Sequence, residues 1–178
     1  PPVRQICPVC RRPSIDGFTH PKCLKPQGLD GLYVLWPYAG VVRKAIISLK
    51  YKFVKEISNE LAFLVSERVK ELFLLKKESG ILTTVPLYWL RKNMRGYNQV
   101  DEIAQGLAKN HNFDFYPDLL MRKKLKEPQV ALSKEERAKN VQGVFALNSK
   151  YKTLVKSAFI IIVDDVYTTG STIKEAAK

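Results

Sequence analysis

The sequence of 178 residues lacks any apolar segment that approaches the ~18 residues needed to span a membrane. It also opens without the basic and then apolar residues that mark a secretory signal. Only three cysteines are present, and an odd number of thiols does not suit a disulfide framework. We therefore expect a protein of a reducing compartment that is not inserted in a membrane.

Acidic residues are also scarce, since 17 Asp and Glu stand against 30 Lys and Arg, for a formal net charge of +13. This excess predicts polyanionic partners, namely nucleic acid, a pyrophosphate-bearing substrate or an acidic membrane surface, without choosing among them. The alternative is a solvated basic surface on a protein that binds only a small phosphorylated molecule. The length suits one domain with a small appendage.

The most informative segment runs from Ile160 to Thr172. It opens with four branched apolar residues, which are typical of a central parallel strand buried on both faces. Asp164 and Asp165 follow at the carboxyl end of this strand, where open α/β sheets bind their ligands. A loop of hydroxyl residues around a glycine comes next and leads into a helix: Thr168, Thr169, Gly170, Ser171 and Thr172.

This loop predicts an anion site. The first turn of a helix has backbone N–H groups without partners, and the helix dipole favours negative charge there. Gly170 allows the backbone to turn sharply and to approach an anion closely. We expect a phosphate in the loop and sugar hydroxyls at Asp164 and Asp165. The alternative is a buried strand, an acidic turn and a Ser/Thr helix cap that bind no ligand.

The three cysteines are grouped with a histidine near the N-terminus, in the order Cys7-x2-Cys10-x9-His20-x2-Cys23. Each tight turn presents two ligands, and thiolates with an imidazole suit a tetrahedral Zn2+ ion. Four protein ligands leave no open position, so the metal would be structural and would supply the folding energy of this small segment. The alternatives are incidental thiols beside an unrelated histidine, or a redox Cys-x2-Cys pair.

Strand and helix patterns alternate along the rest of the chain, which favours a parallel α/β sheet flanked by helices. We expect strands at residues 32–36, 81–85, 144–147 and 158–163. We expect helices over residues 41–51, from a cap at Ser58 to about residue 76, from a cap at Asn98 to residue 108, and from a capping box at Ser133 to residue 140.

A basic loop follows the strand expected at residues 81–85. Because parallel strands point the same way, this loop would share one edge of the sheet with the paired acids. Arg91, Arg95, Gly96 and Tyr97 would then face a pyrophosphate leaving group and neutralise its charge, together with Mg2+. The alternative is that these arginines lie in an exposed turn.

Together these segments resemble the ComF family of phosphoribosyltransferase-like proteins, and residues 160–172 resemble the phosphoribosyl pyrophosphate (PRPP) motif of type I phosphoribosyltransferases along its full length. The matching segments are the Cys/His group, Leu49-Lys50-Tyr51, Val85-Pro86-Leu87, Arg95-Gly96-Tyr97-Asn98-Gln99 and the PRPP motif. A weaker match to the family's hood segment involves Arg122, Gln129, Leu132, Arg137, Asn140 and Phe145. The family often has four cysteines in its knuckle, whereas His20 takes the third position here.

The resemblance implies a type I phosphoribosyltransferase fold, with a zinc knuckle at residues 1–28, a phosphoribosyltransferase-like domain at residues 29–178 and a hood at about residues 116–147. It implies PRPP or a related phosphorylated sugar as ligand, a cytoplasmic location, and a role in DNA uptake during natural competence beside other competence proteins. The chain stops inside the helix that follows the key loop, so we expect a domain truncated at its C-terminus.

The leading hypothesis is a phosphoribosyltransferase that joins PRPP to a nitrogen of a base or amine, with loss of pyrophosphate. Asp164 and Asp165 would hold the ribose and Arg95 the leaving group, by positioning and charge stabilisation rather than covalent catalysis. Lys50, Arg122 and Arg137 are candidates for closing over the ligand. No residue stands out as a general base, and the acceptor is not identified.

The second hypothesis is a non-catalytic protein that binds single-stranded DNA and keeps its PRPP site as a sensor or a vestige. Cationic grooves with stacking aromatic rings bind single strands without sequence preference. Tyr51, Tyr97 and Tyr151 lie beside basic residues and could serve in this way. These rings could equally pack against the core or its rim.

Overall fold

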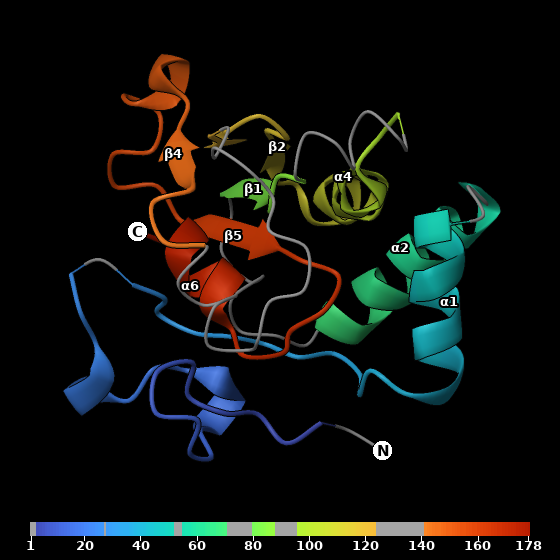
Figure 1. Ribbon diagram of the computed structural model, residues 1–178, viewed down its shortest axis with the longest axis horizontal. Coiled ribbons are helices and arrows are strands. Elements are labelled where there is room, and N and C mark those ends of the chain that lie inside the picture. Colours follow the sequence, from blue (N-terminus) through green and yellow to red (C-terminus); the bar gives the residue numbers. More distant parts are fainter. Residues whose placement is uncertain (1–2, 27, 52–54, 71–79, 88–95, 124–140) are drawn as a thin grey trace.

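The computed structural model describes residues 3–26, 28–51, 55–70, 80–87, 96–123 and 141–178. A parallel sheet of three strands lies at its centre, in the order β2-β1-β5 (Figure 1). The strands are β1 (Ile81–Thr84), β2 (Asp114–Phe115) and β5 (Ile160–Val163). Ile81 lies opposite both Asp114 and Ile160, so β1 is the middle strand and the other two are aligned with its start.

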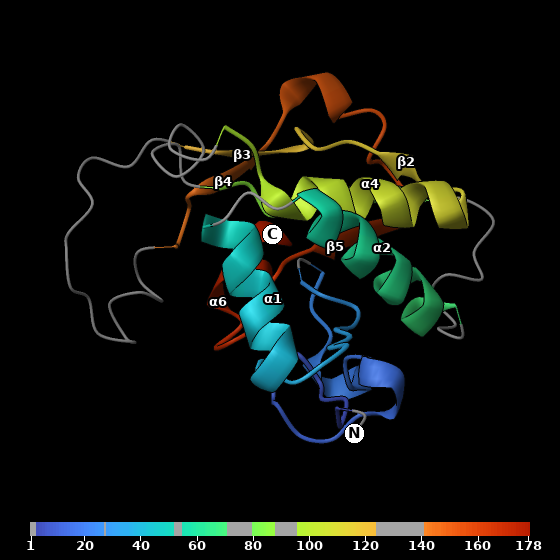
Figure 2. The same ribbon diagram turned by 90° about the vertical axis from the view of Figure 1, so that its right-hand side faces the viewer.

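Helices cover both faces of this sheet. Helix α4 (Gln99–His111) packs on β1, α2 (Lys55–Val69) packs on α4, and α1 (Gly40–Tyr51) packs on α2 (Figure 2). The short helix α6 (Ser171–Ala176) covers the other face. Side chains of a strand alternate between faces, so Ile161 and Val163 of β5 point toward the α4 side whereas Ile162 packs beside α6. The predicted parallel α/β sheet flanked by helices is confirmed.

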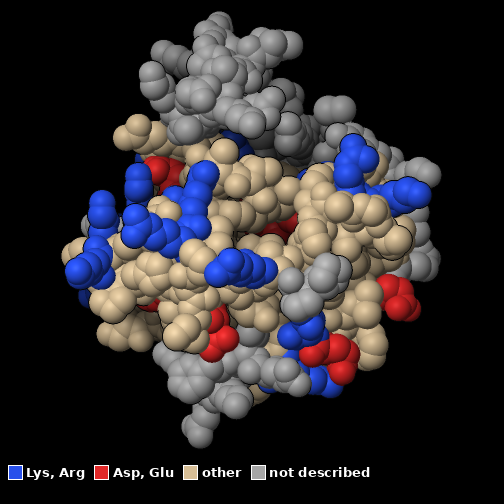
Figure 3. Space-filling view, turned by 90° about the horizontal axis from the view of Figure 1, so that it is seen from below, with Lys and Arg blue, Asp and Glu red and all other residues tan. Residues whose placement is uncertain are grey.

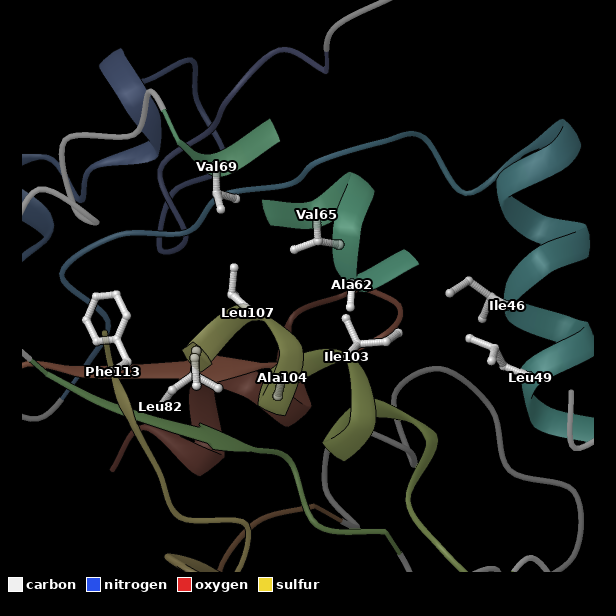
Figure 4. Close-up of a cluster of buried hydrophobic side chains, with 11 residues drawn as sticks. Ile46, Leu49, Ala62, Val65, Val69, Leu82, Ile103, Ala104, Leu107 and Phe113 are labelled. Carbon is white, nitrogen blue, oxygen red and sulfur yellow. The ribbon is translucent and has the colours of Figure 1, made fainter. Parts of the chain in front are cut away.

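One apolar cluster joins the three larger helices to the middle strand (Figure 4). The close approach of α2 and α4 requires the glycine at position 106, where an added Cβ would lie 2.7 Å from the Cβ of Ala62. The cluster thereby fixes the end of α1, which carries Lys50, relative to the sheet. Its buried members are Ile46, Leu49, Ala62, Val65, Val69, Leu82, Ile103, Ala104, Leu107, Ala108 and Phe113.

A second, antiparallel pair of strands lies beside α6. It consists of β3 (Leu120–Arg122) and β4 (Phe145–Leu147). Leu120 and Phe145 pack against a small cluster that contains Val85 and Ile173, which joins this pair to α6 and to the end of β1. These strands flank residues 124–140, so the predicted capping box at Ser133 and the predicted site residue Arg137 lie outside the described residues.

The N-terminal segment is built from turns and runs below the sheet (Figures 1 and 2). Isolated bridges pair Ile6 with Pro13 and Phe18 with Gly31. The 3-10 turn Ile15–Gly17 lies between these bridges, and the turn Pro21–Cys23 lies in the loop that the second bridge closes. The expected strand at residues 32–36 does not form. Instead the side chain of Gln5 bonds both the N–H and the carbonyl oxygen of Val34, so this stretch is held by the N-terminal segment rather than by the sheet.

Two further expectations were wrong. Ser58 does not cap a helix, because α2 already begins at Lys55; the residues before Ser58 are good helix formers and continue the helix upstream. Strand β5 is not a central strand buried on both faces but the outer strand of the described sheet, with Ile160 37% exposed. The strand that is buried throughout is β1.

Half of the residues of β1 are polar although the strand is buried and central. Both of its buried hydroxyls have hydrogen-bond partners. The Thr83 hydroxyl donates to the carbonyl oxygen of Tyr116 at 2.8 Å, and the Thr84 hydroxyl donates to the Asp101 carboxylate at 2.5 Å. The predicted cap of α4 is confirmed, since the Asn98 side chain accepts a hydrogen bond from the N–H of Val100. Within the described part of the chain, no helix combines the length and the apolar character that crossing a membrane requires.

Candidate functional site

The candidate site lies on the loop that joins β5 to α6. Gly170 ends this loop in the left-handed region, with φ 77° and ψ 4°, and α6 begins at Ser171. A Cβ at position 170 would lie 2.7 Å from Cε2 of Tyr167, so a side chain here would meet both backbone strain and a collision. The shape of the loop therefore depends on this glycine.

Hydroxyl groups gather around this turn. The Oγ1 of Thr169 and the Oγ of Ser171 lie 2.9 Å apart, and the N–H of Ser171 donates to Thr169 Oγ1 at 3.4 Å. Thr168 is exposed at the outer end of the loop. These groups can donate hydrogen bonds to an oxyanion, as the sequence predicts for residues 168–172.

The two adjacent acids have different surroundings. Asp165 is 12% exposed, and its Oδ2 accepts hydrogen bonds from Lys50 Nζ at 2.9 Å and from Gln99 Nε2 at 2.7 Å. Asp164 is exposed, and its Oδ1 accepts only from the N–H of Asp165 among the bonds of the described residues. Helices α1 and α4 thus hold Asp165 in place, while the carboxylate of Asp164 is open to solvent.

The surroundings of Asp164 raise its pKa to about 6. Desolvation is the largest cause, and the negative charge of Asp165 is the second; the N–H of Asp165 and the charge of Lys50 act in the opposite direction. The side chain of Asp164 is exposed to solvent. The desolvation therefore comes from protein atoms near the carboxylate that do not cover it completely. Near neutral pH the carboxylate is charged and can accept hydrogen bonds from hydroxyls.

Asp164 and Asp165 line one part of a recess of about 1170 Å³, whereas Lys50, Thr169 and Ser171 are not among its lining residues. Asp164, Asp165 and Thr168 contribute polar groups, whereas Trp36 and Ile162 belong to a mostly apolar remainder. Figure 3 shows a hollowed face on which Lys and Arg side chains gather around an acidic group at the floor of the hollow. The recess can therefore hold a ligand with hydroxyls and an anionic group at its polar end.

The structure brings together only some of the predicted site residues. Lys50 reaches Asp165, as described above, and joins the loop at residues 164–172. Gly96 is exposed with φ 75°, and Tyr97 is half-buried just before α4. Arg122 lies in the antiparallel pair, with its guanidinium carbon 5.5 Å from the centre of the Phe145 ring. The remaining predicted residues, Arg91, Arg95 and Arg137, lie outside the described residues.

Two contributors to the site were not predicted as site residues. Gln99, which is 1% exposed, bonds Asp165 from the first turn of α4; its place directly after the capping Asn98 was the available signal. Arg11 donates from Nη2 to the carbonyl oxygen of Thr169 at 2.5 Å. No pattern in the sequence relates Arg11 to Thr169, which lies 158 positions further along the chain.

The predicted zinc ligands form a single cluster. One potential ligand atom from each of Cys7, Cys10, His20 and Cys23 lies within 4.8 Å of the others. The Nε2 of His20 lies 3.1 Å from the carbonyl oxygen of Pro13 and can donate to it, which leaves Nδ1, 3.3 Å from Cys10 Sγ, to bind a metal. This Cys3His group has the ligand types of a structural Zn2+ site.

The sulfur of Cys7 is fully buried within this cluster. Burial alone would raise its pKa, but backbone N–H groups of Cys10, His20 and Val9 stabilise the thiolate and lower the pKa to about 6. The thiolate is the form of cysteine that binds metals. A lowered pKa suits a redox pair as well, so it is the convergence of all four ligand atoms, His20 included, that favours a metal site over incidental thiols or a redox pair.

Comparison with known proteins gives three informative relatives. DNA utilization protein YhgH of Escherichia coli K12 is 29% identical over 182 residues, which cover 98% of this chain and 77% of that protein. The protein of the same name from Salmonella typhimurium is 30% identical over 190 residues, covering 99% and 79%. Competence protein F of Haemophilus influenzae is 31% identical over 166 residues, covering 88% and 69%.

The chain belongs to the ComF family. The similarity extends over nearly the whole chain, so the ComF resemblance of the separate motifs is confirmed for the sequence as a unit. No family model matches the chain, and no solved structure does. For this ComF protein, the Cys3His group and the loop after β5 are two candidate sites among its described residues.

Proposed function

We propose that this ComF protein binds PRPP, or a related phosphorylated sugar, at residues 164–172 and transfers its phosphoribosyl group with loss of pyrophosphate. The observation that carries the proposal is the asymmetry of the paired acids. Asp165 is fixed by Lys50 and Gln99, and Asp164 stands open beside a loop of hydroxyl groups. A cap without a ligand requires neither feature.

The ribose would lie against Asp164. A carboxylate has about four lone-pair sites and accepts hydrogen bonds from neighbouring hydroxyls, as a ribose presents them. Asp165 uses one oxygen for its two described donors and therefore retains capacity for a further bond. Its main work is to hold the backbone from which Asp164 projects.

The 5′-phosphate would lie in the loop at residues 168–172. The hydroxyls of Thr169 and Ser171 lie close enough to bind one phosphate together, and Gly170 keeps the backbone free of a Cβ. Hydrogen bonds to an ionised acceptor are stronger than those between neutral groups. The loop would therefore fix one end of the ligand while the acids fix its ring.

The transfer would break the bond between C1 of the ribose and the pyrophosphate oxygen and form a bond from C1 to a nitrogen of the acceptor, which gives up a proton. Negative charge develops on the leaving pyrophosphate. Lys50 is a described cation beside the paired acids, and we assign it with Arg91, Arg95, Gly96 and Tyr97 to this leaving group. Mg2+ suits carboxylate and phosphate oxygens, such as those of Asp164, and would supply further neutralisation.

The biological role we propose is the handling of incoming DNA. Relatives of this chain carry the names DNA utilization protein and Competence protein F, and the net charge of +13 suits work near polyanions. We also propose a cytoplasmic location, competence proteins as partners, a zinc knuckle at residues 1–28 and a phosphoribosyltransferase-like domain at residues 29–178 that includes the hood at about 116–147.

A second candidate function is binding of single-stranded DNA without catalysis. The N-terminal segment supports it, because its basic side chains are exposed: Arg4, Arg11, Arg12, Lys22 and Lys25. Tyr151 does not support it. Its ring packs edge-on against Tyr116 at 4.9 Å, and its hydroxyl bonds Asp118 at 2.6 Å, so it is engaged within the protein.

Calorimetry distinguishes the two candidates. We expect PRPP with Mg2+ to bind the wild-type protein and Asp164→Asn to weaken this binding at least tenfold, while circular dichroism shows an unchanged fold. Release of pyrophosphate with a nitrogen nucleophile present would establish turnover. If PRPP does not bind, and a single-stranded oligonucleotide binds with an affinity that falls steeply with salt, the second candidate replaces the first.

A further inference from the structure

The N-terminal segment touches the candidate phosphate loop at one point. The guanidinium of Arg11 donates from Nη2 to the carbonyl oxygen of Thr169, 2.5 Å away. Thr169 lies in the centre of the loop, directly before Gly170. A residue of the metal cluster's own turn therefore holds the backbone that would surround the anion.

The metal-binding turn sets the position of Arg11. Arg11 follows the ligand Cys10 directly and has φ 60°, a left-handed conformation that few non-glycine residues adopt. Its N–H donates to the carbonyl oxygen of Cys7 at 2.9 Å, and the N–H of Cys7 donates to the carbonyl oxygen of Arg12 at 2.9 Å. The backbone that presents two metal ligands thus also directs the Arg11 side chain.

The carbonyl that Arg11 binds is the group that an anion-binding loop has to turn outward. A loop that points N–H and O–H groups at an anion must keep its carbonyl oxygens away from the negative charge. Such an outward carbonyl needs a partner of its own, because an unpaired backbone group weakens the conformation that leaves it unpaired. Arg11 is that partner for Thr169.

We propose that the zinc knuckle acts through Arg11 as a positioning element of the sugar-phosphate site, so that metal occupancy sets the order of the phosphate loop and its affinity for a phosphate. The identity of the ligand rests on the proposed function, whereas the contact between Arg11 and Thr169 does not. With the metal bound, the turn at Cys7 and Cys10 is fixed and Arg11 holds Thr169. Without the metal, the turn loosens and releases the loop.

The charge of Arg11 also acts on α6, beside the hydrogen bond to Thr169. Lys174, in α6, has a lowered pKa; burial is the largest cause, and the positive charge of Arg11 is the next. Arg11 is therefore within electrostatic reach of the helix as well as the loop.

The test compares Arg11→Ala with Arg12→Ala, an exposed neighbour whose replacement removes the same charge. Zinc content is measured by mass spectrometry, and ribose 5-phosphate binding by calorimetry without Mg2+, so that a chelator acts on zinc alone. We expect Arg11→Ala to keep its zinc and to bind ribose 5-phosphate about threefold to tenfold more weakly, as loss of a charge-assisted hydrogen bond implies. Arg12→Ala should bind like the wild type.

Removing zinc from the wild-type protein should weaken binding by a similar factor, and removing it from Arg11→Ala should add little, because both changes act through one contact. Hydrogen exchange without ligand gives an independent readout. The amides of residues 168–172 should exchange faster in Arg11→Ala and in the zinc-free protein than in Arg12→Ala.

The two proposals fail in different ways. Faster exchange together with no binding of ribose 5-phosphate to the wild type would refute the proposed function and keep the coupling. Unchanged exchange and unchanged binding in Arg11→Ala would overturn the coupling and leave the site intact. Equal weakening in Arg11→Ala and Arg12→Ala would also overturn it, since the effect would then come from net charge.

Discussion

At the scale of single residues, two identical side chains acquire different properties from their neighbours. Asp164 and Asp165 are adjacent, yet one is open with a raised pKa and the other is bound by Lys50 and Gln99. The sequence predicts both as ligands of a sugar. It does not predict that one of them faces helices α1 and α4, because that depends on where those helices pack.

The raised pKa of Asp164 predicts a pH-dependent cost in stability. The pKa rises from 3.8 to about 6 on folding, so the folded state binds the proton more tightly and the charged form opposes folding. This cost is fully present above pH 6 and absent below pH 3.8. We expect Asp164→Asn to raise the melting temperature at pH 7.5, by a margin that shrinks as the pH falls toward 4.

Asp118→Asn is the control of opposite sign. Hydrogen bonds from Lys150 and then Tyr151 lower the pKa of Asp118, so its charged form favours folding. This replacement should lower the melting temperature at pH 7.5, and the loss should diminish as the pH falls toward the lowered pKa. Melting curves of both variants from pH 7.5 to below pH 3.8 test the assignment, because the Asp118 contribution diminishes only below its unfolded pKa of 3.8. Shifts of the same sign in both variants would contradict it.

Lys50 and Asp165 form a partly buried ion pair, with 21% and 12% of their side chains exposed. Asp165→Asn leaves the Lys50 charge with a neutral acceptor, and we expect it to lower the free energy of unfolding by about 1–3 kcal/mol. Urea denaturation measures the change. Lys50→Met combined with Asp165→Asn should cost less than the sum of the two single changes; additive losses would show that the pair does not act as a unit.

At the scale of elements, the turn into α6 is the feature that one substitution tests best. Gly170→Ala meets both a left-handed φ of 77° and a contact of 2.7 Å with the Tyr167 ring. We expect a loss in stability of about 1–3 kcal/mol and weaker binding of PRPP. Thermal melting and calorimetry measure the two effects.

Gly143→Ala is the matched control for this turn. Gly143 has a similar φ of 69°, but a Cβ there would meet no atom of the described residues within 4 Å. It therefore reports backbone strain alone, and the difference between the two variants isolates the collision with Tyr167. If both alanine variants lose the same free energy of unfolding, the contact between position 170 and the Tyr167 ring does not contribute to stability.

Element prediction succeeded where the signal was local and failed where it depended on neighbours. The Asn98 cap follows from a side chain that bonds an N–H two residues away, so the sequence contains it. The stretch at residues 32–36 has strand-like residues, but Gln5 binds it and no sheet strand does. The apolar residues of β5 predict a central strand. In the described sheet, the more polar β1 is the middle strand.

At the scale of the whole molecule, the Cys3His group adds to the turns, bridges and backbone hydrogen bonds that hold the N-terminal segment together. The buried members of this segment are few, including Cys7 and Thr19, so bound metal would supply much of its stability. We expect Cys7→Ser to lose zinc and to loosen residues up to about 25. Mass spectrometry of the native protein and hydrogen exchange measure the two effects.

Two outcomes would contradict this expectation. Zinc content that is unchanged in Cys7→Ser would remove Cys7 from the ligand set. Loss of zinc without faster exchange in residues 3–26 would mean that the turns and bridges hold the segment by themselves. The loop after β5 should also loosen in this variant if the contact between Arg11 and Thr169 transmits the change.

The sequence by itself determined the ligand types and their spacing: the Cys3His set, the acids at the end of a strand, and the hydroxyl loop with its glycine. These are patterns within short stretches, where the covalent chain already brings the groups together. The tertiary structure decided which acid is open, that Gln99 and Lys50 hold its neighbour, and that Arg11 reaches Thr169. Those contacts join segments far apart in the chain, and only the packing of helices and turns around the sheet brings such segments within hydrogen-bonding distance.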